Sequence, residues 1–118
     1  MSKASPTSFN FIGKDSTFNG DFILSGDTHV FGKINGKISG PPGVKLVVEY
    51  TGQIEGDISG VSIIIHGQLL GDIKQAERVE ITSTGKVKGS IESKTFEIFP
   101  GAKIIGQIKS RKKETHSQ

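Results

Sequence analysis

Residues 52–58 have the sequence Gly52-Gln53-Ile54-Glu55-Gly56-Asp57-Ile58. The same order of glycine, polar residue and apolar residue recurs along the chain, with a degenerate first and last copy. The copies occupy residues 16–22, 32–38, 52–58, 67–73, 85–91 and 102–108. We therefore expect a repeat protein in which each unit packs against the next.

Apolar and polar residues alternate within each copy, and this period of two is typical of β-strands rather than helices. A glycine lies midway between the two inward residues. A bend at that point leaves little room for a Cβ atom or requires a positive φ, so we interpret these glycines as corners. The predicted corners are Gly20, Gly36, Gly56, Gly71, Gly89 and Gly106.

A second alternating apolar pair precedes most copies, as Leu46 and Val48 do before residues 52–58. Three strand segments per repeat predict an all-β, single-stranded triangular β-helix of about six coils, with like residues stacked about 4.8 Å apart. The predicted inner columns are Phe18, Ile34, Ile54, Leu69, Val87, Ile104 and Phe22, Ile38, Ile58, Ile73, Ile91, Ile108. The expected body is 11–108, between flexible tails at 1–10 and 109–118.

Such a coil is open at both ends, and no amphipathic helix in the sequence precedes residue 16 or follows residue 108 to cover them. The phenylalanines lie near the two ends of the repeat region. They either cover the terminal coils within one molecule or bury themselves against another copy. The second hypothesis assigns a polymer interface to Phe11, Phe18 and Phe22 at one end and to Phe96, Phe99, Ile104 and Ile108 at the other. The polarity of such a polymer stays open.

The run of glycine and isoleucine turns from Gly32 to Ile108 resembles the bactofilins. The resemblance implies a right-handed triangular β-helix that polymerises into filaments without nucleotide. It also implies a cytoplasmic scaffold at the inner face of the membrane, which supports cell shape or localises cell-wall enzymes.

Little in the sequence points to catalysis or to a cofactor. Cysteine is absent, His29, His66 and His116 lack metal-ligand spacing, and no phosphate-binding glycine motif occurs. We expect no enzyme activity, no metal and no bound nucleotide. The alternatives are a carbohydrate-binding or adhesive β-helix and, less favoured by the irregular repeat lengths, an acyltransferase-like solenoid.

The net charge of +3 comes from the C-terminal end of the chain. With Lys109, Arg111, Lys112, Lys113 and Glu114 set aside, 11 basic and 11 acidic residues remain, so we expect no nucleic-acid-binding face. An outer column places Lys37 between Asp21 and Asp57, where exposed ion pairs are expected.

Three smaller surface features suggest contacts. Lys3 and Phe9 are a possible membrane contact, and the basic C-terminal tail either meets lipid headgroups or only solubilises the chain. Leu70 and Ile105 interrupt an otherwise polar outer column and suggest a lateral contact.

Overall fold

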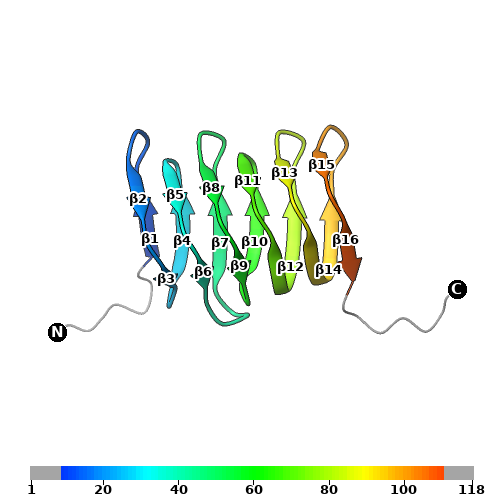
Figure 1. Cartoon of the computed structure of the whole chain (residues 1–118), viewed down its shortest axis with the longest axis horizontal. Helices are drawn as coiled ribbons and strands as arrows, with labels where there is room; N and C mark the ends of the chain where they lie inside the picture. Colours follow the sequence, from blue (N-terminus) through cyan, green and yellow to red (C-terminus); the bar gives the residue numbers. More distant parts are fainter. Residues whose placement is uncertain (1–8, 111–118) are drawn as a thin grey trace, which may run out of the picture.

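The computed structural model describes residues 9–110, and for residues 9–11 it describes the backbone only. This range contains sixteen strands and no helix. All strand pairs are parallel, and each strand pairs with the equivalent strand of the next turn. Figure 1 shows the resulting stack of coils, with the N-terminal coil in blue and the C-terminal strands β15 and β16 in orange at opposite ends.

The coil has three faces, which we call A, B and C. Face A contains β1 (Phe9–Ile12), β4 (Asp27–Val30), β7 (Lys45–Val48), β10 (Ser62–Ile65) and the second halves of β12 (Ile73–Ile81) and β14 (Ile91–Ile98). Face B contains β2 (Thr17–Asn19), β5 (Lys33–Asn35), β8 (Gln53–Glu55), β11 (Gln68–Leu70), β13 (Lys86–Lys88) and β15 (Lys103–Ile105). Face C contains β3 (Phe22–Ile23), β6 (Ile38–Ser39), β9 (Ile58–Ser59), the first halves of β12 and β14, and β16 (Ile108–Ser110). The predicted triangular β-helix of about six coils is thereby confirmed.

The inner columns follow the predicted register. On face B, Ile34 pairs with Ile54 and Ile54 with Leu69, and on face C the equivalent pairs join Ile38 to Ile58 and Ile58 to Ile73. These side chains are almost fully buried. Each isoleucine removed from water in this way contributes about 1.5–3 kcal/mol, which compensates for a core only one coil wide.

In every coil, the residue at the bend between faces B and C is a glycine. All six predicted corner glycines have φ between 136° and 145°. An ideal Cβ on Gly56 would lie 1.9 Å from the carbonyl oxygen of Gly36 in the preceding coil, and the next three corners are equally closed. Both the conformation and the contact therefore exclude a side chain at this corner.

Carboxylates next to the corner connect successive coils through the backbone. The Oδ1 atom of Asp72 accepts a hydrogen bond from the backbone N–H of Ser90 at 3.0 Å, and Asp57 accepts one from Asp72 at 3.3 Å. The backbone N–H of Lys37 donates to Asp21 in the same way, at 3.4 Å. The ion pair of Asp57 is formed with Lys74, at 4.0 Å, where Lys37 was expected as a partner.

Two irregularities interrupt the repeat without disturbing the inner columns. Gln75, with φ of 55°, lies at a register shift between β12 and β14. The loop at Pro41 and Pro42 lengthens one turn, and Val44 closes it by donating its N–H to the Pro41 carbonyl at 3.0 Å. Val44 itself is buried at the corner between faces C and A.

The strands extend slightly beyond the predicted body, since β1 begins at Phe9 and β16 ends at Ser110. Residues 1–8 and 111–118, which hold most of both predicted tails, lie outside the described residues.

We expect Gly56→Ala to lower the free energy of unfolding by about 3 kcal/mol or more, because the methyl group meets a backbone oxygen and the residue keeps a positive φ. Gly43→Ala is the matched control, since a Cβ there has no atom within 4 Å, and it should change stability by less than about 1 kcal/mol. Urea unfolding followed by circular dichroism compares the two. Equal midpoints would contradict the steric role of the corner.

Candidate interaction site at the two open ends

Exposure along each inner column depends on position in the stack rather than on residue type. Ile58 is 0% exposed in the middle of its column, whereas Ile108 at the end of the same column is 43% exposed. On face B, Ile54 is 0% exposed and Phe18 is 44% exposed. The core is thus closed on its three sides and open along its axis.

The N-terminal end presents an aromatic pair around an apolar hollow. The rings of Phe18 and Phe22 meet edge to face, with centroids 6.2 Å apart and planes at 64°. A hollow of about 380 Å³ lies beside them and includes Leu24 and Thr28 among its lining residues. Ile23 extends this surface at the rim and is 85% exposed.

The C-terminal end presents aliphatic side chains and one aromatic ring. Ile98, Phe99 and Ile108 are each 37–43% exposed. Phe96 and Ile104 are partly buried and pack against the core from this side. Apolar surface of this extent at both ends of one rod is typical of an interaction site.

The backbone is also open at both ends. β2 and β15 are the outermost strands of the face B sheet, and each pairs with a described strand on one side only. The outer N–H and C=O groups of such strands are available to a further strand at the usual β-spacing. A partner that covers either end therefore gains hydrogen bonds as well as apolar contact.

Most residues predicted for a polymer interface lie at these ends. Phe18 and Phe22 meet at the N-terminal end, and Phe96, Phe99, Ile104 and Ile108 lie together at the C-terminal end. Phe11 pairs in register with His29 on β4, and the next residue, Ile12, is buried in the core. The side chains of Phe9 and Phe11, and all of Lys3, lie outside the described structure.

Sequence reasoning missed two end residues, Ile23 and Ile98. Ile23 lies in an outward column that continues with Ser39 and Ser59. An apolar residue in this otherwise polar column was the sequence signal that could have indicated a contact. Ile98 ends an inner column and was counted only as a core position. Leu70 and Ile105 do share one outward column on face B, and the lateral contact suggested for them stays a prediction.

Polar groups elsewhere serve local contacts. In the described part of the chain, no group of three or more histidine and acidic residues is arranged to hold a metal ion. The Nδ1 atom of His29 contacts Glu49 Oε2 at 2.8 Å, and that of His66 contacts Thr82 Oγ1 at 2.9 Å. Residues 9–110 also contain no helix of the length and hydropathy needed to cross a bilayer.

Comparison with known proteins identifies the family. Residues 10–109 match the sequence model of the bactofilins, described as polymer-forming cytoskeletal proteins. The chain belongs to the bactofilin family. The predicted family is thereby confirmed.

Two relatives come from Myxococcus xanthus strain DK1622. Bactofilin BacO is 30% identical over 103 residues, which cover 87% of this chain and 80% of BacO. Bactofilin BacP is 25% identical over 108 residues, which cover 92% of this chain but only 44% of BacP.

A solved structure shares the fold. The crystal structure of a point mutant of the bactofilin from Thermus thermophilus superposes with a TM-score of 0.66 and covers 77% of this chain and 99% of that one. At 21% identity this likeness supports the fold alone.

Alanine substitutions in the middle and at the end of the face C inner column test how the open end differs from the core. We expect Ile58→Ala to lower the free energy of unfolding by about 2–5 kcal/mol at any protein concentration, because it leaves a cavity. Ile108→Ala should cost less than about 1 kcal/mol in dilute solution, where its side chain is already half in water. Its cost should grow with protein concentration if the end becomes covered. Thermal unfolding across a concentration series measures both effects, and equal costs in dilute protein would contradict the open end.

Proposed function

We propose that this bactofilin assembles by stacking the open ends of its coil on the ends of other copies, which continues the β-helix into a filament without nucleotide. The single observation that carries the proposal is the 37–44% exposure of core-column and neighbouring side chains at both ends, against about 0% in the middle. The family description as polymer-forming agrees with it.

The N-terminal corner supports the same proposal. At Gly20 an added Cβ would meet no atom of the described residues within 4 Å, whereas at Gly36 it would lie 1.8 Å from the Gly20 carbonyl oxygen. Within residues 9–110, no preceding coil fills the space beside Gly20 as one does at the other corners. Gly20 nevertheless has a positive φ of 136°, close to the 143–145° of the other corners. The first coil therefore has the shape needed to accept another coil.

The two interactions that join successive coils within the chain, apolar burial and hydrogen bonds between strands, are also available at the ends. Apolar side chains at each end leave water when covered, at about 25 cal/mol per Å² of area buried. The outer groups of the edge strands exchange hydrogen bonds with water for hydrogen bonds within a sheet. A filament built in this way needs no nucleotide to drive its assembly.

The scaffold role follows from the filament. We propose that the polymer lies in the cytoplasm along the inner face of the membrane and supports cell shape or the placement of cell-wall enzymes. The family likeness is the support for this role. The tail residues Lys3 and Phe9 stay candidates for part of the membrane contact.

An arginine at either end should block that end, since a buried unpaired charge costs several kcal/mol. We expect Phe18→Arg and Ile108→Arg each to abolish filaments, as seen by negative-stain electron microscopy and pelleting without nucleotide. Tyr50→Arg is the matched control, because Tyr50 is 73% exposed on the side of the rod, and it should polymerise normally. Thermal melts in dilute protein verify that all three variants fold.

The same variants reveal how ends meet. If like ends meet, each blocked variant stops at a dimer in light scattering after gel filtration. If unlike ends meet, each variant alone is a monomer and the equimolar mixture forms a dimer. Filaments of normal length from both blocked variants would refute end-to-end assembly.

A further inference from the structure

Face B has an excess of positive charge that the composition conceals. Its outward positions in the described strands hold four lysines and one glutamate. These are Lys33, Lys86, Lys88, Lys103 and Glu55. Residues 1–108 contain equal numbers of basic and acidic residues, so the other surfaces are correspondingly less positive. The folded rod thus has one basic side.

The charges on face B are compensated only in its N-terminal half. There the Lys33 ammonium lies 3.6 Å from the Glu55 carboxylate. In the C-terminal half, Lys86 pairs in register with Lys103, and Lys88 lies on the same strand as Lys86. Among the described residues, none of these three forms an ion pair. Like charges side by side on a sheet repel each other, and an anionic surface would relieve that repulsion.

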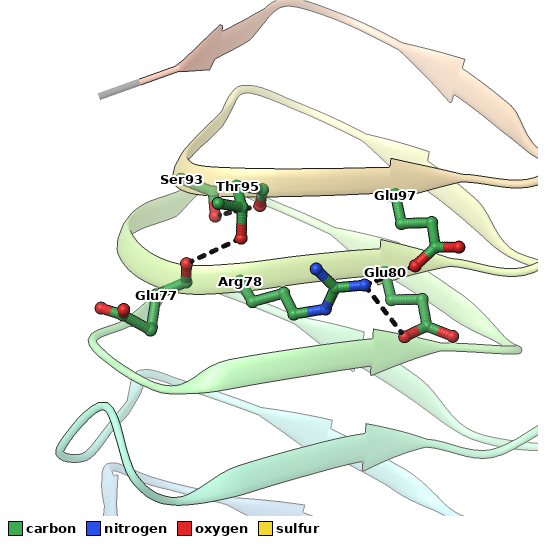
Figure 2. A network of polar contacts seen from close by, with 6 residues as sticks. All are labelled: Glu77, Arg78, Glu80, Ser93, Thr95 and Glu97. Atoms are coloured by element: carbon green, nitrogen blue, oxygen red, sulfur yellow. Dashed lines mark hydrogen bonds and ion pairs between the residues drawn. The ribbon is translucent and has the colours of Figure 1, made fainter. Parts of the chain in front are cut away.

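Away from face B, three basic residues have acidic partners, whereas none of the ion pairs in the described chain involves Lys14, Lys37 or Lys45. Figure 2 shows Arg78 on face A between Glu97 and Glu80. Arg78 donates a hydrogen bond to Glu97, and its guanidinium lies 3.9 Å from the Glu80 carboxylate. Lys94 lies 3.7 Å from Glu77, and on face C Lys74 pairs with Asp57. The C-terminal half of face B is distinguished because its lysines without ion pairs are neighbours, with Lys86 paired in register with Lys103 and Lys88 on the same strand as Lys86.

Apolar and amphipathic side chains accompany these lysines. Lys88 stands between Leu70 and Ile105 in one outward column, and Ile105 is 65% exposed. At the border with face A, Tyr50 and Lys86 line a hollow of about 440 Å³. Tyrosine and exposed aliphatic residues next to lysines are the combination that binds at a lipid interface. Nucleic acid binding uses the positive charges but gives no role to Leu70 and Ile105.

We propose that the basic patch, formed by Tyr50, Leu70, Lys86, Lys88, Lys103 and Ile105, lies against an anionic lipid surface. The three ammonium groups meet the headgroups, while Ile105 and Leu70 reach toward the acyl boundary. This inference rests on the proposed membrane association and assigns it to the folded body in addition to the tails. Each subunit of a filament adds one patch, so polymerisation multiplies a weak contact.

Vesicle flotation tests the proposal, because filaments sediment on their own but do not float without lipid. The probe is a vesicle of phosphatidylglycerol and phosphatidylcholine, with pure phosphatidylcholine as the neutral comparison. The full chain with Lys86→Gln, Lys88→Gln and Lys103→Gln should bind anionic vesicles at least about 100-fold more weakly. The matched control replaces Lys14, Lys37 and Lys45 with glutamine, which gives the same net charge, and should bind as the wild type does.

A second variant, Ile105→Ser, distinguishes insertion into a lipid surface from purely electrostatic binding to other anions. Salt at about 0.5 M screens the lysines, so the binding that remains should depend on apolar insertion. Ile105→Ser should lose that remainder while its filaments stay unchanged.

Four results would overturn the proposal. The wild type could fail to float with anionic vesicles, or the lysine variant and its control could float equally. In a parallel binding assay, the lysine variant could lose binding to duplex DNA and keep binding to vesicles. Finally, the lysine variant alone could fail to pellet in the absence of lipid. The last result would assign the patch to a lateral contact between copies. Filament formation is scored without vesicles in the same preparations, so failure of end-to-end assembly is recognised separately.

Discussion

The close approach of successive coils at the glycine corner is the constraint on which the rest of the structure depends. A Cβ at Gly36, Gly56 or Gly71 would lie 1.8–2.0 Å from the carbonyl oxygen of the preceding corner. With no side chain there, neighbouring coils can stay at parallel-strand spacing on all three faces at once. Every outward or inward position then becomes a column, and the environment of a residue depends on its column and its height in the stack.

This constraint also explains why the ends differ from the middle. A repeat that stacks by translation has no internal signal to stop, and its apolar columns continue unchanged up to Phe18, Phe22, Ile104 and Ile108. The contact between two coils of one chain and the contact proposed between two chains therefore use the same apolar columns and the same kind of strand edge. The difference is that the first is intramolecular and the second depends on concentration.

The fold was predictable because the alternation of apolar and polar residues and the spacing of the repeats can both be read directly from the sequence. Aligning the copies was enough to place Ile54, Leu69 and Val87 in one column. The hand of the coil depends on backbone twist, which column composition does not record. The carboxylate of Asp72 could not be assigned to the Ser90 N–H from sequence, because side-chain pairs were the only partners that the columns suggested. The basic side was missed because charges were summed along the chain, although one repeat brings Lys103 beside Lys86.

The geometry of stacking limits where a bactofilin filament can touch anything else. Once both ends are covered by other copies, only the three lateral faces stay accessible. On face A the charges of Arg78 and Glu97 neutralise each other, and on face C the carboxylates of Asp57 and Asp72 are engaged with the next coil. Face B alone combines neighbouring lysines without acidic partners in the described chain with an isoleucine that is 65% exposed. The proposed end contact uses inward side chains and the backbone edge of β15, whereas the basic patch uses outward side chains. Polymerisation therefore leaves the basic patch free, and each added subunit strengthens the proposed attachment to an anionic surface.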